Sequence, residues 1–176
     1  ALGAYQLVKS VRTIVDIGGQ DCKVIALNDR GRVVDFQMND RCSAGTGRFF
    51  EVIARVLGLS LTELSELALQ SDSPCQISKQ CSVFAESEVI SLVNDNVPLK
   101  DICAGVTESI ARRIKGMIYK VGLTEDLALT GGCAQNKALA VALEHHLGVS
   151  LVHLPENPQI IGALGAAIFA LEHSAQ

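Results

Sequence analysis

Two cysteines, Cys42 and Cys81, each stand just before a segment that we expect to be helical. A thiolate at a helix N-terminus is stabilised by the helix dipole and by the exposed backbone N–H groups. Thiolates surrounded by donors suit iron–sulfur or zinc ligation, although two ligands fill only half of a four-ligand site. A symmetric dimer would complete such a site with two cysteine ligands from each chain. Buried free cysteines are the alternative interpretation.

Other residues with reactive side chains give weaker signals. Cys75 lies near Cys81 and is an alternative ligand, whereas Cys103 falls inside a helical pattern and is expected in the core. Cys22 and Cys133 lie in glycine turns and are read as small residues near a ligand. The helix dipole stabilises acidic side chains in the first turns of a helix. Glu86 is therefore expected mainly to cap its helix and interact with the dipole, and a nucleotide or coupling contact is the alternative. Two neighbouring histidines near a helix end, His145 and His146, are read as a solvated face.

Two glycine-rich turns could hold phosphate groups. The first is Asp-Ile-Gly-Gly-Gln-Asp at residues 16–21, and the second is Thr-Gly-Gly at residues 130–132. Glycines let backbone N–H groups approach phosphate oxygens, and Asp16 at a strand end could orient Mg²⁺ through water. Each turn alone is equally compatible with a tight turn. Because ligands gather at the carboxyl ends of strands in α/β sheets, the pair favours a nucleotide site.

The composition is that of an ordinary globular chain. Of its 176 residues, 48% are apolar and 19% charged, and the net charge is −4. This balance, with no Trp and few other aromatics, argues against nucleic-acid binding. The longest apolar stretch, residues 160–171, is too short for a membrane helix. Because no basic segment precedes an apolar one at the start, we expect a cytoplasmic protein whose cysteines are free or bind metal.

The hydrophobic pattern predicts an α/β fold with a helical insertion. Three strands are expected at residues 13–18, 23–27 and 33–38, with a glycine turn at residues 28–31. Helical spacing follows at residues 46–57, at 60–68 behind a capping box, at 82–93 and from Pro98 to Val121. Strands are expected again at 127–129 and 151–154, and helices at 136–147 and 158–171. The order of elements places an α/β core at about 11–40 and 126–172 and a helical insertion at about 43–122.

These motifs together resemble a known family. The runs are Asp-Ile-Gly-Gly-Gln-Asp-x-Lys, Met-Asn-Asp-x-Cys-x-Ala-Gly-Thr-Gly-Arg-Phe, Cys-x-Val-Phe-Ala-Glu-Ser-Glu-Val-Ile-Ser-Leu, Thr-Gly-Gly and Pro-Gln-Ile-x-Gly-Ala-Leu-Gly-Ala-Ala. They are similar to the ATP-dependent activators of 2-hydroxyacyl-CoA dehydratases and the ATPase subunits of benzoyl-CoA reductase. The resemblance covers nearly the whole chain, and the two cysteine runs are long and specific.

The resemblance implies an actin-like ATPase with two ribonuclease-H-like lobes and ATP between them, of which this chain carries the C-terminal lobe. It implies a homodimer bridged by one [4Fe-4S] cluster, whose ligands fall on Cys42 and Cys81 of each chain. Hydrolysis of ATP would drive an electron into a partner dehydratase or reductase, and a ferredoxin- or flavodoxin-type protein would supply it. The implied ATP and Mg²⁺ contacts are Asp16, Gly18, Gly19, Gln20, Asp21, Gly131, Gly132 and Asn136, with Asp16 catalytic.

Two other functions remain open at this stage. An actin-like small-molecule kinase would use the glycine turns but would not need Cys42 or Cys81. A non-catalytic lobe would dock to a partner that supplies the rest of the nucleotide cleft.

Overall fold

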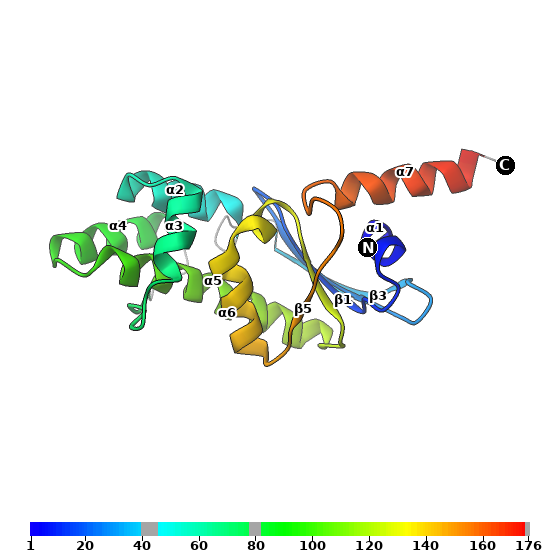
Figure 1. Ribbon diagram of the computed structural model, residues 1–176, viewed down its shortest axis with the longest axis horizontal. Coiled ribbons are helices and arrows are strands. Elements are labelled where there is room, and N and C mark those ends of the chain that lie inside the picture. The colour runs from blue at the N-terminus through cyan, green and yellow to red at the C-terminus, as the bar shows by residue number, and fades with distance from the viewer. Residues whose placement is uncertain (40–45, 78–81, 175–176) are drawn as a thin grey trace.

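The computed structural model describes residues 1–39, 46–77 and 82–174, and shows a mixed sheet with helices on both faces (Figure 1). The strands are β1 (Thr13–Ile17), β2 (Cys22–Leu27), β3 (Val33–Asn39), β4 (Leu127–Thr130) and β5 (Leu151–Val152). Their order in the sheet is β3-β2-β1-β4-β5, with β1–β2–β3 an antiparallel meander and β4 and β5 parallel to β1. The predicted α/β class and three-stranded meander are therefore confirmed.

The helices form two groups on opposite faces of the sheet (Figure 1). The first group is α2 (Gly47–Leu57), α3 (Leu61–Ala68), α4 (Ser82–Asn94), α5 (Leu99–Val121) and α6 (Lys137–Leu147). It encloses the larger apolar core, in which Cys103 is fully buried, as predicted. The second group is α1 (Leu2–Leu7) and α7 (Ile161–Ser174), which cover a smaller core. A short 3-10 helix, η1 (Gly132–Gln135), joins β4 to α6.

Local sequence signals account for many of the helix ends. The predicted capping box is present, because Ser60 Oγ accepts from Glu63 N at 3.2 Å and Glu63 Oε2 accepts from Ser60 N at 2.7 Å. Gly58 and Gly148 end α2 and α6 with φ of +68° and +69°, a backbone conformation that favours glycine. Pro98 lies one position earlier than predicted: it precedes α5 as its N-cap.

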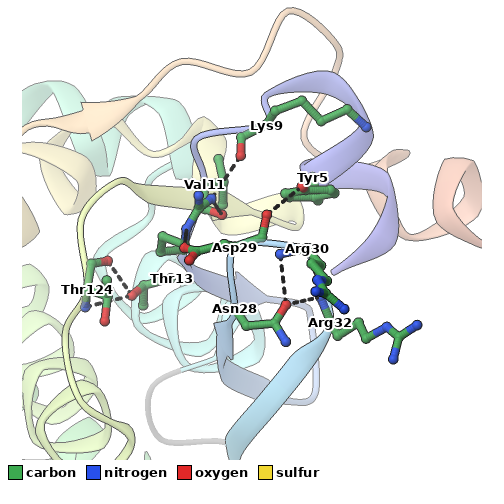
Figure 2. Close-up of polar contacts among 10 residues, drawn as sticks. Tyr5, Lys9, Val11, Thr13, Asn28, Asp29, Arg30, Arg32 and Thr124 are labelled. Carbon is green, nitrogen blue, oxygen red and sulfur yellow. Dashed lines mark hydrogen bonds and ion pairs between the residues drawn. The ribbon is translucent and has the colours of Figure 1, made fainter.

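The N-terminal helix α1 has no counterpart in the prediction and is held by tertiary contacts. The hydroxyl of Tyr5 donates to the carbonyl of Asp29 at 2.9 Å (Figure 2). Arg12, in the segment between α1 and β1, places its Nε 3.2 Å from Asp29 Oδ1. The Tyr5 ring packs so closely on the β2–β3 turn that a Cβ at Gly31 would lie 2.2 Å from it. These contacts attach α1 to the predicted glycine turn of the hairpin.

The two helices of the smaller layer cross at glycines. A Cβ at Gly3 would lie 2.2 Å from the carbonyl oxygen of Ile161 and 2.9 Å from the nitrogen of Gly165. Gly165 therefore allows the close backbone packing of α7 on α1, whereas Gly162 has open space beside it. Ile161 is the one buried residue of α7 within its described side chains. In the described part of the chain, we find no helix with the length and apolarity that crossing a membrane requires.

Candidate nucleotide site

The two glycine turns meet at one edge of the sheet. Strands β1 and β4 are parallel neighbours, and their register places Asp16 beside Thr130, the last paired residues before each turn. The hydroxyl of Thr130 donates to Asp16 Oδ1 at 2.9 Å. The expectation that both turns lie at the carboxyl ends of strands is therefore confirmed, and the structure adds that the two strands are neighbours.

The second turn requires glycine at its centre. Gly131 has a φ of +83°, and a Cβ there would lie 2.4 Å from the carbonyl oxygen of Ile17. Its nitrogen donates to the carbonyl of Pro158 at 2.9 Å, which ties the turn to the segment before α7. The Thr-Gly-Gly turn is thus pressed against the end of β1 by a contact that no other residue type could make without movement.

The first turn carries the N-terminus of α2. The nitrogens of Gly47 and Arg48 donate to the carbonyls of Gly18 and Gly19, each at 2.8 Å. Gly47 needs to be small here, since a Cβ would lie 3.2 Å from Gly18 O and 3.3 Å from Cys133 Sγ. The first two amides of α2 thus bind the turn, and this docking fixes the start of the helix at the edge of the site.

A pocket of about 370 Å³ opens between the two turns and the helices beyond them. Pockets of this order take small-molecule ligands. Gly18 and Gly19 of the first turn and Gly132 of the second line it, and the other lining residues come mainly from α2, α3, η1 and the start of α6. The wall residues are Gly47, Phe50, Glu51, Leu61, Thr62, Ser65, Glu66, Leu69, Cys133, Gln135, Lys137 and Gln159.

Four predicted contact residues lie outside the pocket lining. Asp16 and Asp21 lie beside the first turn, Gln20 is exposed at its tip, and Gly131 is covered by β1. The structure thus brings Gly18, Gly19, Gly132 and Asn136 to one cavity and keeps the two carboxylates at its edge.

The pocket walls are joined by polar contacts at the start of α6. Asn136 caps this helix through its side-chain oxygen, which accepts from Leu139 N at 3.0 Å. The hydroxyl oxygen of Ser65, a buried residue of α3, accepts from Ala138 N at 3.2 Å. Ser65 therefore connects the α3 wall to the α6 wall, a role for which the sequence gave no signal.

Three charged side chains lie beside the first turn. Lys23 pairs with Asp16 in the register of β1 and β2, and its Nζ contacts Asp21 Oδ2 and lies 4.0 Å from Asp16 Oδ2. The two carboxylates and the hydroxyl of Thr130 are hard oxygen donors of the kind that Mg²⁺ prefers. The donor set therefore fits this metal. Lys23 and Thr130 were missed as individual site residues, although a short antiparallel hairpin after Asp16 implies a partner directly across the strand.

The four described cysteines all lie where the pKa of the thiol is raised. Burial, followed by the charge of Asp16, raises the pKa of Cys22 to about 12. Burial, followed by the charge of Glu51, raises the pKa of Cys133 to about 12. Burial also raises the pKa of Cys103 to about 11, and that of Cys75 in the same direction. None of these four environments favours a thiolate.

The predicted cluster ligands Cys42 and Cys81 lie outside the described residues. Within residues 1–39, 46–77 and 82–174, no group of three or more His, Cys, Asp or Glu side chains is arranged to hold a metal ion. Glu86 of α4 is half-buried, and its suggested nucleotide or coupling contact stays a prediction.

One prediction about surface residues is wrong. His146 is not on a solvated face, because its Nε2 lies 2.5 Å from Glu108 Oε2 of α5 and its side chain is 18% exposed. The contact joins α5 to α6, two helices that also pack extensively through apolar residues.

The fold is that of one lobe of an actin-like ATPase. The actin-like, ribonuclease-H-like topology is shared with two solved activator structures and, as fold alone, with the ethanolamine utilization protein EutJ from Carboxydothermus hydrogenoformans (TM-score 0.57, 18% identity, 96% of this chain and 53% of that one). The model of the BadF/BadG/BcrA/BcrD ATPase family matches residues 1–170. The chain belongs to this family.

Two of the similar curated proteins are named for the activation of acyl-CoA dehydratases. The chain is 49% identical over 172 residues to the activator of lactoyl-CoA dehydratase from Anaerotignum propionicum, covering 98% of this chain and 66% of that protein. It is 45% identical over 176 residues to the (R)-2-hydroxyglutaryl-CoA dehydratase activating ATPase from Acidaminococcus fermentans, covering 100% of this chain and 67% of that protein. The chain therefore spans about two thirds of the length of these relatives.

Two solved structures superpose on nearly the whole chain. The activator of the 2-hydroxyisocaproyl-CoA dehydratase from Clostridium difficile, with bound ADPNP, gives a TM-score of 0.93 at 38% identity, covering 99% of this chain and 65% of that one. Component A of the Acidaminococcus fermentans (R)-2-hydroxyglutaryl-CoA dehydratase gives a TM-score of 0.94 at 44% identity, covering 99% of this chain and 67% of that one.

Proposed function

We propose that this chain is the C-terminal nucleotide-binding lobe of a cytoplasmic ATPase that activates a CoA-ester dehydratase or a benzoyl-CoA-type reductase by ATP-driven transfer of one electron. One observation supports this most strongly. Asp16 and both glycine turns lie together at the carboxyl edge of the sheet, where the turns border a pocket. All 176 residues of the chain also align with a relative named as an activating ATPase. One of the similar structures holds ADPNP.

The residues at the strand ends would divide the work of nucleotide binding. Asp16, oriented by Thr130, would position Mg²⁺ and the attacking water, with Asp21 beside it. Gly18, Gly19 and Gln20 would form the phosphate turn, and the backbone N–H groups of Gly19 and Gln20 would donate to the phosphate oxygens. The Gly18 nitrogen already donates to the carbonyl of Asp21 at 2.9 Å and so would shape the turn. Gly131, Gly132 and Asn136 would flank the adenosine, and the pocket between α2, α3 and α6 would receive the base and sugar.

The electron-transfer part of the proposal depends on Cys42 and Cys81. Two copies of the chain would form a homodimer, and these cysteines from each copy would hold one [4Fe-4S] cluster. Such a cluster supplies one-electron chemistry at low potential. A ferredoxin- or flavodoxin-type protein would reduce it, and the partner enzyme would accept the electron.

The nucleotide part is tested by calorimetric titration of the protein with ADP and Mg²⁺. Asp16→Asn should weaken binding at least tenfold, because it removes the charge that attracts the metal. Asp72→Asn is the matched control, since Asp72 is exposed in the loop after α3 and should bind as the wild type does. Equal affinity of the two variants would contradict the role of Asp16.

The cluster part is tested by iron, acid-labile sulfide and solution mass on anaerobically purified protein. About four irons per dimer are expected, lost together with their absorbance in Cys42→Ser. Cys75→Ser is the matched control and should keep its iron, because burial raises the pKa of the Cys75 thiol. A metal-free protein that cannot be reconstituted would remove the electron-transfer role.

The other two candidate functions give different results in these experiments. A small-molecule kinase would keep its activity after replacement of both Cys42 and Cys81. A docking lobe would dimerise without nucleotide turnover. The chain spans about two thirds of the length of its relatives, and in this alternative a partner would supply the rest of the nucleotide cleft.

A further inference from the structure

Lys23 places an ammonium group between two carboxylates at the first glycine turn. Its Nζ contacts Asp21 Oδ2 and lies 4.0 Å from Asp16 Oδ2. Asp16 has its other oxygen engaged by Thr130, so Oδ2 is the oxygen that faces the lysine. About a third of each of the three charged side chains is exposed: 30% for Lys23, 36% for Asp16 and 35% for Asp21.

The backbone fixes this arrangement. Asp16 and Lys23 are paired in the antiparallel register of β1 and β2, and the next pair, Ile17 and Cys22, closes the turn. The backbone of Asp21 is also fixed, because its carbonyl oxygen accepts a hydrogen bond from the Gly18 nitrogen at 2.9 Å. The lysine therefore reaches both carboxylates from a rigid strand, and the three charges form a compact group with a net charge of −1.

We propose that Lys23 is the resident cation of the Asp16 and Asp21 carboxylates, and that Mg²⁺ competes with its ammonium group for the same oxygens. The inference deepens the proposed nucleotide site, and it concerns how that site is regulated. Without nucleotide the ammonium balances the carboxylates and keeps divalent cations weakly bound. When phosphate oxygens arrive at Gly18 and Gly19, they offer the ammonium an alternative partner.

This exchange would couple the two ligands. An anionic phosphate beside the turn attracts the lysine away from the carboxylates and leaves them free for the metal. Metal binding would therefore be favoured when nucleotide is present and disfavoured when it is not. The consequence is a positive coupling between Mg²⁺ and nucleotide that depends on a single side chain.

The experiment measures divalent-metal binding with and without nucleotide. Mn²⁺ serves as the probe, because it takes the same oxygen ligands and its free ion is counted from its electron paramagnetic resonance signal. Titrations are run on wild type, Lys23→Gln and Lys120→Gln, each with and without ADP. Lys120 is exposed at the end of α5, so its variant removes the same charge away from the turn.

In the absence of ADP, Lys23→Gln should bind Mn²⁺ roughly tenfold more tightly than the wild type, because a competing unit charge has been removed. The gain should disappear in Lys23→Gln/Asp16→Asn. ADP should strengthen Mn²⁺ binding by a smaller factor in Lys23→Gln than in the wild type. Lys120→Gln should match the wild type in both titrations. Circular dichroism of each variant checks that it folds.

The results separate this inference from the proposed function. Unchanged or weaker Mn²⁺ binding by folded Lys23→Gln without ADP would overturn the competition. Failure of the wild type to bind ADP would instead contradict the nucleotide site, and the comparison of Mn²⁺ binding without ADP would still decide whether Lys23 competes with the metal.

Discussion

The hydroxyl of Thr130 donates a hydrogen bond of 2.9 Å to the carboxylate of Asp16, across two strands that are 114 residues apart in the chain. Thr130 is 3% exposed, so its hydroxyl is shielded from water, while the Asp16 carboxylate that it binds stays about one third open to solvent. It joins β1 to β4 at the point where each strand ends in a glycine turn. The orientation of the proposed metal-positioning carboxylate is therefore set by a residue of the second turn.

Removing this hydroxyl should weaken the proposed site more than it weakens the fold. Thr130→Val keeps the shape and loses the bond, so we expect about 1 kcal/mol less stability and roughly tenfold weaker binding of Mg²⁺ and ADP. Calorimetric titration measures the affinity, and urea unfolding measures the stability.

Thr107→Val is the control for this substitution. Thr107 is also buried, and its hydroxyl donates to the carbonyl of Cys103 at 3.0 Å within α5. It should lose similar stability and keep the wild-type affinity. If Thr130→Val also kept that affinity, the bond to Asp16 would have no role in binding.

Gly131 should tolerate no side chain. Gly131→Ala places a Cβ 2.4 Å from the carbonyl oxygen of Ile17 at a φ of +83°, so we expect a loss of about 3 kcal/mol or more in the free energy of unfolding. Gly116→Ala is the matched substitution in α5, where a Cβ has open space, and it should gain about 0.5–1 kcal/mol. Urea denaturation of both variants measures the difference. A loss under 1 kcal/mol in Gly131→Ala would mean that the turn moves easily.

The local features of the fold could be predicted because they depend on neighbouring residues. The capping box of Ser60 and Glu63, the helix stops at Gly58 and Gly148, and the apolar spacing of α5 are all contained in short windows. The position of both glycine turns at strand ends was also accessible from short windows, and it favoured a ligand site at a carboxyl edge. The pairing of β1 with β4 was not predicted, because it joins segments 114 residues apart.

The features that were missed depend on contacts between distant segments. Helix α1 is only six residues long, and its stability comes from Tyr5 on the β2–β3 turn and from the crossing at Gly165. His146 meets Glu108 across 38 residues of sequence. Local propensity carries no information on such pairings, because it is the assembled sheet and helices that bring the partners together.

The buried thiols should make the protein lose stability at alkaline pH. The pKa of Cys22 and that of Cys133 are each about 12 in the folded chain, against an ordinary value of 9.0. Above pH 9 the unfolded chain releases these protons while the folded chain keeps them. The unfolded state then binds fewer protons, and the free energy of unfolding falls as pH rises from 9 toward 12.

Each of the two thiols contributes up to about 1.4 kcal/mol of this loss per pH unit. Urea unfolding at pH 8, 9 and 10 should therefore give a shallower decline for Cys22→Ala/Cys133→Ala than for the wild type. Lysines and tyrosines titrate in both proteins, so the difference between the two slopes reports the thiols. Parallel declines would show that these cysteines ionise as readily when folded as when unfolded.

Ser65 should affect ligand binding through the pocket walls, although it belongs to a helix that the sequence linked to no site. Its oxygen accepts from Ala138 N and so joins α3 to the first turn of α6. Ser65→Ala leaves that amide without its partner and lets the walls separate, so we expect about 1 kcal/mol less stability and several-fold weaker ADP binding. Ser60→Ala is the control, since Ser60 caps α3 itself, is absent from the pocket lining and should cost a similar stability. Weakened ADP binding in Ser65→Ala, with unchanged binding in Ser60→Ala, would assign the effect to the link between the walls. Equal affinities in the two variants would show that helix stability alone matters.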